Sequence, residues 1–123
     1  MKKLLYLNLA LLGLLFSCKK DHPIDIGTTG SETISGVISA DMTLKPEVKY
    51  LLKGQVYVKN NATLTIPAGV TVEVEKNDNP ADKSALIITK GSKIMVNGTS
   101  DLPVVFTSAA ASKAAGDWIG IIV

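Results

Sequence analysis

The sequence predicts an all-β chain that forms the start of a parallel β-helix, a solenoid of short strands, after a signal peptide and a flexible tether. Three observations predict this architecture. β-Branched residues alternate with polar ones from about Ile34 onward. Turn residues interrupt the alternation at short intervals, and one apolar pattern recurs after 22 residues. The 123 residues suffice for one small domain.

The predicted strands are short, and turn residues separate them. Segments such as Lys59-Asn60-Asn61 and Asn97-Gly98-Thr99 supply turns, because asparagine and glycine tolerate a left-handed backbone. The Ala-rich segment 109–115 has no apolar stripe and is too short to predict a helix. Strands are predicted at residues 33–38, 55–58, 63–66, 70–74, 85–88, 93–96, 104–107 and 118–123.

The internal repeat predicts how the strands stack. Its shared pattern is L-x-I-x-x-G-x-x-[VI]-x-[VI], in which Leu64 aligns with Leu86 and Ile66 with Ile88. Neither copy can bury its apolar row alone, so stacked copies are predicted to form a ladder of aliphatic side chains. The alternative is an antiparallel β-sandwich with a hairpin turn at Asn97-Gly98, which does not explain the constant offset. The predicted inward residues are Leu64, Ile66, Val70, Val72, Val74, Leu86, Ile88, Ile94 and Val96. The predicted outward residues are Thr63, Thr65, Thr71, Glu73, Glu75, Lys93 and Met95.

The N-terminus has the features of a secretory signal. Lys2 and Lys3 precede an apolar run at residues 4–16, which would span roughly 20 Å as a helix and so falls short of a membrane core of about 30 Å. The run ends in Leu-Phe-Ser-Cys, which resembles the bacterial lipobox. The resemblance implies cleavage between Ser17 and Cys18 and lipid attachment to Cys18. The alternative is an ordinary secretory signal with an incidental cysteine.

A tether is predicted to follow the anchor. Residues 18–35 are rich in Gly, Thr, Ser and Asp, which predicts a flexible spacer between a signal peptide at 1–17 and β-helix coils at 36–123. The charged segment Lys19, Lys20 and Asp21 resembles the surface-export signal of Bacteroidota lipoproteins. Its alternative interpretation is a solvated base of the tether.

Composition excludes several classes of function. Removal of two signal lysines from 13 basic residues leaves 11 against 11 acidic residues, and the chain has no arginine. A neutral chain without arginine is a poor nucleic-acid binder, so no nucleic-acid partner is expected. A lone histidine in the tether predicts no metal site and no Ser/His/Asp set.

Two acidic groups remain as candidates for chemistry. Glu73 and Glu75 would share one strand face, as a carboxylate pair of a glycosidase would, but an ordinary solvated face is the favoured interpretation. Asp78, Asn79 and Asp82 could bind calcium weakly, although a solvated turn explains them better. We therefore expect no catalytic residue, no cofactor and no enzymatic activity in this chain.

The mature sequence also resembles a family. Segments 61–69, 85–99, 103–108 and 116–120 are similar to exported right-handed β-helix lipoproteins of the Bacteroidota. The resemblance covers roughly residues 50 to 123 and implies an outer-membrane or cell-surface location. It also implies a longer chain, because members usually continue beyond this point and the apolar segment 118–123 would leave an unpaired edge. A complete protein whose edge is covered by self-association is the alternative.

These observations predict a membrane-anchored lipoprotein with a structural, adhesive or binding β-helix and no enzymatic role. The membrane is the expected partner through lipid on Cys18, and an extracellular glycan or a surface protein is a possible second partner. The alternative is the N-terminal fragment of a polysaccharide-degrading β-helix enzyme whose active site lies outside this chain.

Overall fold

The computed structural model describes residues 30–123, and every strand pairing in this range is parallel. The parallel β-helix prediction is therefore confirmed, and the antiparallel sandwich is excluded. No helix in this range is long and apolar enough to cross a membrane. The elements are β1 (Gly30–Ile38), β2 (Met42–Thr43), β3 (Val48–Val58), β4 (Thr63–Pro67), β5 (Thr71–Val74), the 3-10 turn η2 (Pro80–Asp82), β6 (Ala85–Ile88), β7 (Lys93–Asn97), β8 (Val105–Ser108) and β9 (Gly120–Ile122).

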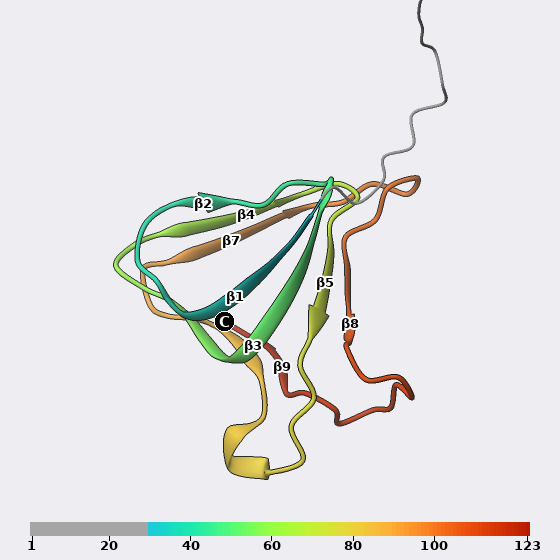
Figure 1. Ribbon diagram of the computed structural model, residues 1–123. Helices are drawn as coiled ribbons and strands as arrows, with labels where there is room; N and C mark the ends of the chain where they lie inside the picture. The colour runs from blue at the N-terminus through green and yellow to red at the C-terminus, as the bar shows by residue number, and fades with distance from the viewer. Residues whose placement is uncertain (1–29) are drawn as a thin grey trace, which may run out of the picture.

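The strands form three faces around one core (Figure 1). The first face is the sheet β2-β4-β7, at the upper left of Figure 1. The second face joins the first halves of β1 and β3 to β5 and β8. The third face joins the second halves of β1 and β3 to β6 and β9. β1 and β3 turn the corner at Gly36 (φ 74°) and Gly54 (φ 70°), and glycine suits this positive φ because it has no Cβ.

The predicted stacking register is wrong. Leu64 lies beside Ile94 instead of Leu86, and Leu86 lies beside Val56. A spacing of 22 does occur where Met42 pairs with Leu64, but the spacing from Leu64 to Ile94 is 30. The same apolar alternation occurs on every face. A repeat in the sequence therefore does not show whether two matching strands are stacked on the same face or lie on different faces, as β4 and β6 do.

The core is a set of aliphatic ladders that run from coil to coil. Of the predicted inward residues, seven are buried, from Leu64 to Ile88 along the chain. Ile94 is half-buried and Val96 is 48% exposed, because β7 is the edge strand of its sheet. The core cluster comprises Ile34, Ile38, Leu44, Tyr50, Leu52, Val56, Val58, Ala62, Leu64, Ile66, Val70, Val72, Val74, Leu86 and Ile88.

Several strand boundaries differ from the prediction by one residue, and the larger differences are at β1, β3 and β9, besides β2, which was not predicted. β1 begins at Gly30, so residues 30–35 of the predicted tether belong to a strand that pairs with β3. β3 begins seven residues earlier than predicted. The sequence has no apolar–polar alternation there, because apolar Leu51 is half-buried between buried Tyr50 and buried Leu52. β2 is too short to show a period, and β9 covers only Gly120–Ile122 of the predicted 118–123.

The ladder predicts unequal costs for one substitution at two leucines. Leu64 is 1% exposed and Leu102 is 55% exposed. Leu64→Ala should lower the free energy of unfolding by about 2–5 kcal/mol, because it opens a cavity in the core. Leu102→Ala should change it by about 0.5 kcal/mol. Urea unfolding followed by circular dichroism measures both, and equal losses would contradict the core described above.

Candidate functional site: a polar hollow beneath an inserted loop

The corner between the second and third faces changes from coil to coil. β3 turns this corner within Lys53 and Gly54, whereas residues 75–84 form a loop at the same corner of the next coil. A second loop, residues 109–119, follows one coil later. Both loops project at the lower end of Figure 1, and the first carries η2. The longer loops therefore overhang the tight corner of β3.

A hollow of about 380 Å³ lies under the first loop. One side is the corner of β3 and the other is the loop itself. Its lining offers an ammonium group, carboxylates and side-chain amides, which are the hydrogen-bonding groups that small-ligand sites use for orientation. The lining residues are Lys53, Gly54, Gln55, Glu75, Asn77, Ala81 and Asp82.

Side-chain hydrogen bonds within the loop of residues 75–84 fix the side of the hollow that the loop forms. Asn79 caps η2, because its Oδ1 accepts a hydrogen bond from the Ala81 amide at 3.1 Å. Its Nδ2 donates to Asp82 Oδ2 at 2.6 Å. Asn77 Oδ1 accepts from the Asn79 amide at 3.0 Å. These contacts give the predicted acidic turn a structural role.

The two other acidic candidates are held in ion pairs. Glu73 Oε2 lies 3.0 Å from Lys49 Nζ, and Glu75 Oε2 lies 3.9 Å from Lys53 Nζ, in each case across neighbouring strands or their ends. Such cross-strand pairs explain the alternation of acidic residues on the outward side of β5. Among residues 30–123, no three His, Cys, Asp or Glu side chains gather in a group that could hold a metal ion.

An apolar row borders the hollow on the third face. Val37, Tyr57, Ile87 and Ile122 are paired in register across β1, β3, β6 and β9. Val37, at one end of the row, is 54% exposed, and Ile122, at the other end, is 46% exposed.

The apolar row meets the hollow at Gln55, because Tyr57 Oη donates a hydrogen bond to Gln55 Oε1 at 2.9 Å. Lys59 Nζ lies 5.4 Å from the centroid of the Tyr57 ring.

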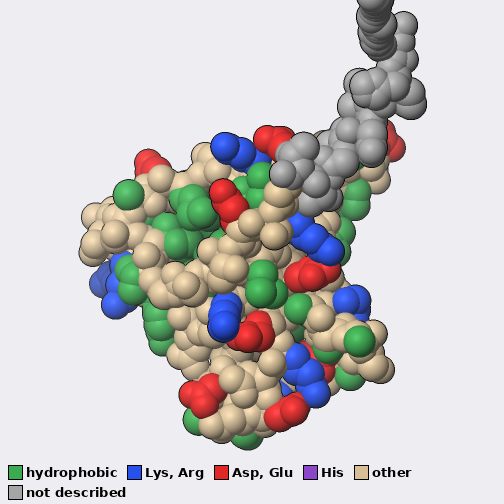
Figure 2. All heavy atoms as spheres, in the orientation of Figure 1, with side chains coloured by type: hydrophobic (Ala, Val, Ile, Leu, Met, Phe, Trp, Pro, Cys, Tyr) green, Lys and Arg blue, Asp and Glu red, His purple; other side chains and the backbone are tan. Residues whose placement is uncertain are grey.

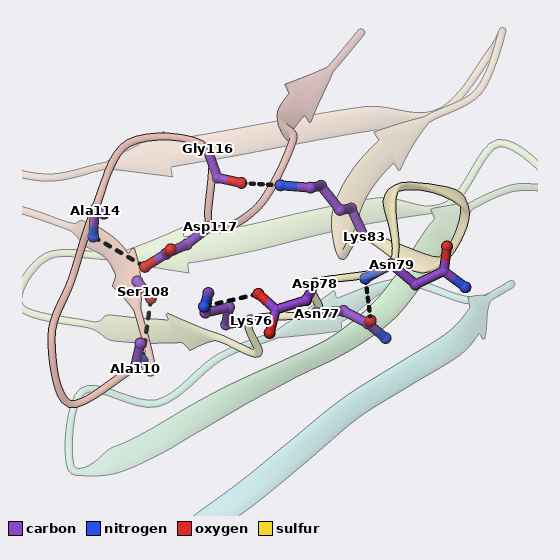
Figure 3. Close-up of polar contacts among 10 residues, drawn as sticks. All are labelled: Lys76, Asn77, Asp78, Asn79, Lys83, Ser108, Ala110, Ala114, Gly116 and Asp117. Carbon is purple, nitrogen blue, oxygen red and sulfur yellow. Dashed lines mark hydrogen bonds and ion pairs between the residues drawn. The ribbon is translucent and has the colours of Figure 1, made fainter.

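The second loop supports the first from the next coil (Figure 3). Lys83 Nζ donates to the Gly116 carbonyl, which joins the two loops. Asp117 is 4% exposed, and its Oδ2 accepts from the Ala114 amide at 3.0 Å. The Ser108 hydroxyl hydrogen-bonds to Asp117 and lowers the pKa of its carboxyl group, with smaller lowering effects from the Ala114 amide and from lysine charges nearby. The loop is therefore organised around an ionised carboxylate.

This buried carboxylate predicts an acid-sensitive loop. A folded-state pKa below the unfolded value of about 3.9 means that ionised Asp117 stabilises the fold above that value. The contribution is lost as the pH falls through the lower, folded-state pKa. Asp117→Asn should therefore destabilise the protein most near pH 7, and the difference from the unmodified protein should shrink below about pH 4.

Urea unfolding across this pH range measures the difference. The single tryptophan, Trp118, gives the signal because it follows Asp117 and stacks on Phe106 with ring centroids 6.2 Å apart. Exposed Asp101 provides the control, since Asp101→Asn removes the same charge outside this loop. A difference for Asp117→Asn that stays constant with pH would contradict the role of its ionisation.

Of the residues singled out from the sequence, Glu75 and Asp82 line the hollow, whereas the residues of the predicted anchor cannot be placed relative to it. Ser17, Cys18, Lys19, Lys20 and Asp21 lie outside the described residues. Sequence reasoning missed the roles of the β3 corner and of the outward aromatic in β3. The available signal was the interruption of the strand pattern between β5 and β6, which marks an inserted loop.

Comparison with known protein families gives a match that agrees with the parallel β-helix described above. The family model described as a pectate-lyase-like β-helix domain matches residues 36–123. No curated protein and no solved structure matches the chain. The match supports the β-helix part of the resemblance drawn from the sequence.

Proposed function

This chain belongs to the pectate-lyase-like β-helix domain family, and from that premise we propose that it is a lipid-anchored envelope protein that binds extracellular polysaccharide without cleaving it. Lipid on Cys18 would hold it in the membrane, and the stacked coils would present the hollow to the surroundings. The family includes enzymes, so cleavage is an outcome that the experiments below must measure.

The observation that carries the binding proposal is the junction of the hollow with the apolar row. A sugar ring has apolar faces edged by hydroxyl groups, so it fits a surface where apolar side chains adjoin hydrogen-bonding ones. Tyr57 and Gln55 supply that junction through their 2.9 Å hydrogen bond. The side chains of Asn77 and Asp82 line the hollow next to it.

Binding without catalysis is supported by the state of the acidic side chains. A typical glycosidase uses two carboxylates that flank the bond to be broken, one of them as an acid with a raised pKa. Glu73 and Glu75 instead face Lys49 and Lys53 across the strands. Each carboxylate therefore has a lysine of the neighbouring strand as its partner, and cross-strand pairing explains these two residues without a catalytic role.

Binding through the hollow predicts a loss in Gln55→Ala. Removal of the amide takes away hydrogen bonds worth about 1 kcal/mol, so affinity for the bound polysaccharide should fall roughly fivefold. Asn97→Ala is the matched control, because it removes an exposed amide from β7 on the first face. Affinity electrophoresis on a panel of polysaccharides measures both variants. Equal affinity for Gln55→Ala and Asn97→Ala, or release of reducing ends or unsaturated products, would contradict the proposal.

The anchor predicts a defined mass and a defined effect of one substitution. Native protein extracted from membranes should begin at Cys18 and exceed the mass of its own polypeptide by about two or three acyl chains. Cys18→Ser should leave the protein without lipid and move it from the membrane fraction to the soluble fraction. Intact-mass spectrometry of both fractions measures this, and an unlipidated native protein would contradict the anchor.

A further inference from the structure

We propose that the hollow selects neutral polysaccharides over polysaccharides built from uronates. This inference rests on the proposed function and names the class of ligand for the same site. It follows from the charges of the lining, from the pairing of nearby lysines and from the apolar row beside the hollow.

Among residues 30–123, the cation that lines the hollow is already paired with a carboxylate. Lys53 is the cation of the lining, and its Nζ already lies 3.9 Å from Glu75 Oε2. Asp82 adds a second carboxylate, so the lining carries one positive and two negative groups. A bound uronate would bring a third carboxylate close to these two, and like charges a few ångströms apart repel each other.

Three lysines outside the lining have partners of their own. Lys76 Nζ lies 2.7 Å from Asp78 Oδ1, and Lys83 donates to the Gly116 carbonyl of the second loop. Lys59 lies over the Tyr57 ring. Figure 2 shows acidic and basic side chains interspersed over the lower part of the molecule, without a field of one sign. The chain also lacks arginine, the side chain that recognises carboxylates through two parallel hydrogen bonds.

The apolar row favours the same class of ligand. Tyr57 and Ile87 are half-buried and point outward from the third face, where they can contact the apolar face of a sugar ring. Contact with these side chains removes water from the ring, and a charged substituent would resist that desolvation. A neutral hexose or pentose therefore suits both parts of the surface, whereas a uronate suits neither.

Binding by the full-length protein to matched oligosaccharides tests the selectivity. The probes are neutral hexasaccharides of glucose, galactose and xylose, and hexasaccharides of galacturonate and glucuronate. Isothermal titration at low salt should show at least about tenfold tighter binding of a neutral probe, as repulsion at a partly exposed site implies.

Two glutamate variants separate the role of the hollow from that of overall charge. Glu75→Gln frees Lys53 in the hollow and should tighten uronate binding about tenfold, an effect that added salt should abolish. Glu73→Gln is the control, because it removes the same charge but frees Lys49, which does not line the hollow. It should leave uronate binding unchanged.

The outcomes distinguish the inference from the function on which it rests. Tighter uronate binding by the unmodified protein would overturn the selectivity and leave polysaccharide binding intact. Equal gains for Glu75→Gln and Glu73→Gln would overturn the assignment of selectivity to the hollow. Absence of binding to every probe would overturn the proposed function together with this inference.

Discussion

Parallel hydrogen bonding between successive coils is the constraint on which this structure depends. It fixes the side chains of each face in register, so that an inward residue on one coil lies beside an inward residue on the next, as Tyr50 lies beside Val72. The buried aliphatic ladders follow from this register, and their removal from water provides the main favourable free energy of the fold. The outward rows are fixed by the same register.

The same constraint leaves the corners free to vary. Because pairing holds only the strands, a corner can be two residues, as at Lys53 and Gly54, or a loop, as at residues 75–84. Loops at the same corner of successive coils come together, and here Lys83 and the buried carboxylate of Asp117 hold them in place. A hollow arises where a tight corner is followed by a long one.

Ion pairs balance the charges of neighbouring strands on the outer surface. Pairs such as Lys49 with Glu73 lie across neighbouring strands and are partly exposed, so each contributes about 0–1 kcal/mol. In the selectivity that we propose, the pair of Lys53 with Glu75 also lowers the attraction of the hollow for an anionic ligand. The outward position of Tyr57 adds an apolar contact next to these groups.

The all-β class, the parallel solenoid and most of the inward residues could be predicted from the sequence, because the two-residue alternation and the turn residues are local properties of the chain. The resemblance of Leu-Phe-Ser-Cys to a lipobox, on which the proposed anchor at Cys18 rests, is also a feature of the sequence alone. The neighbouring strands could be assigned only from the three-dimensional arrangement, which places Leu64 beside Ile94 and residues 30–35 in a strand. The hollow could not be predicted for the same reason: it brings Gln55 and Asp82 together across two coils, and inserted loops change the spacing between coils without changing the pattern on any strand.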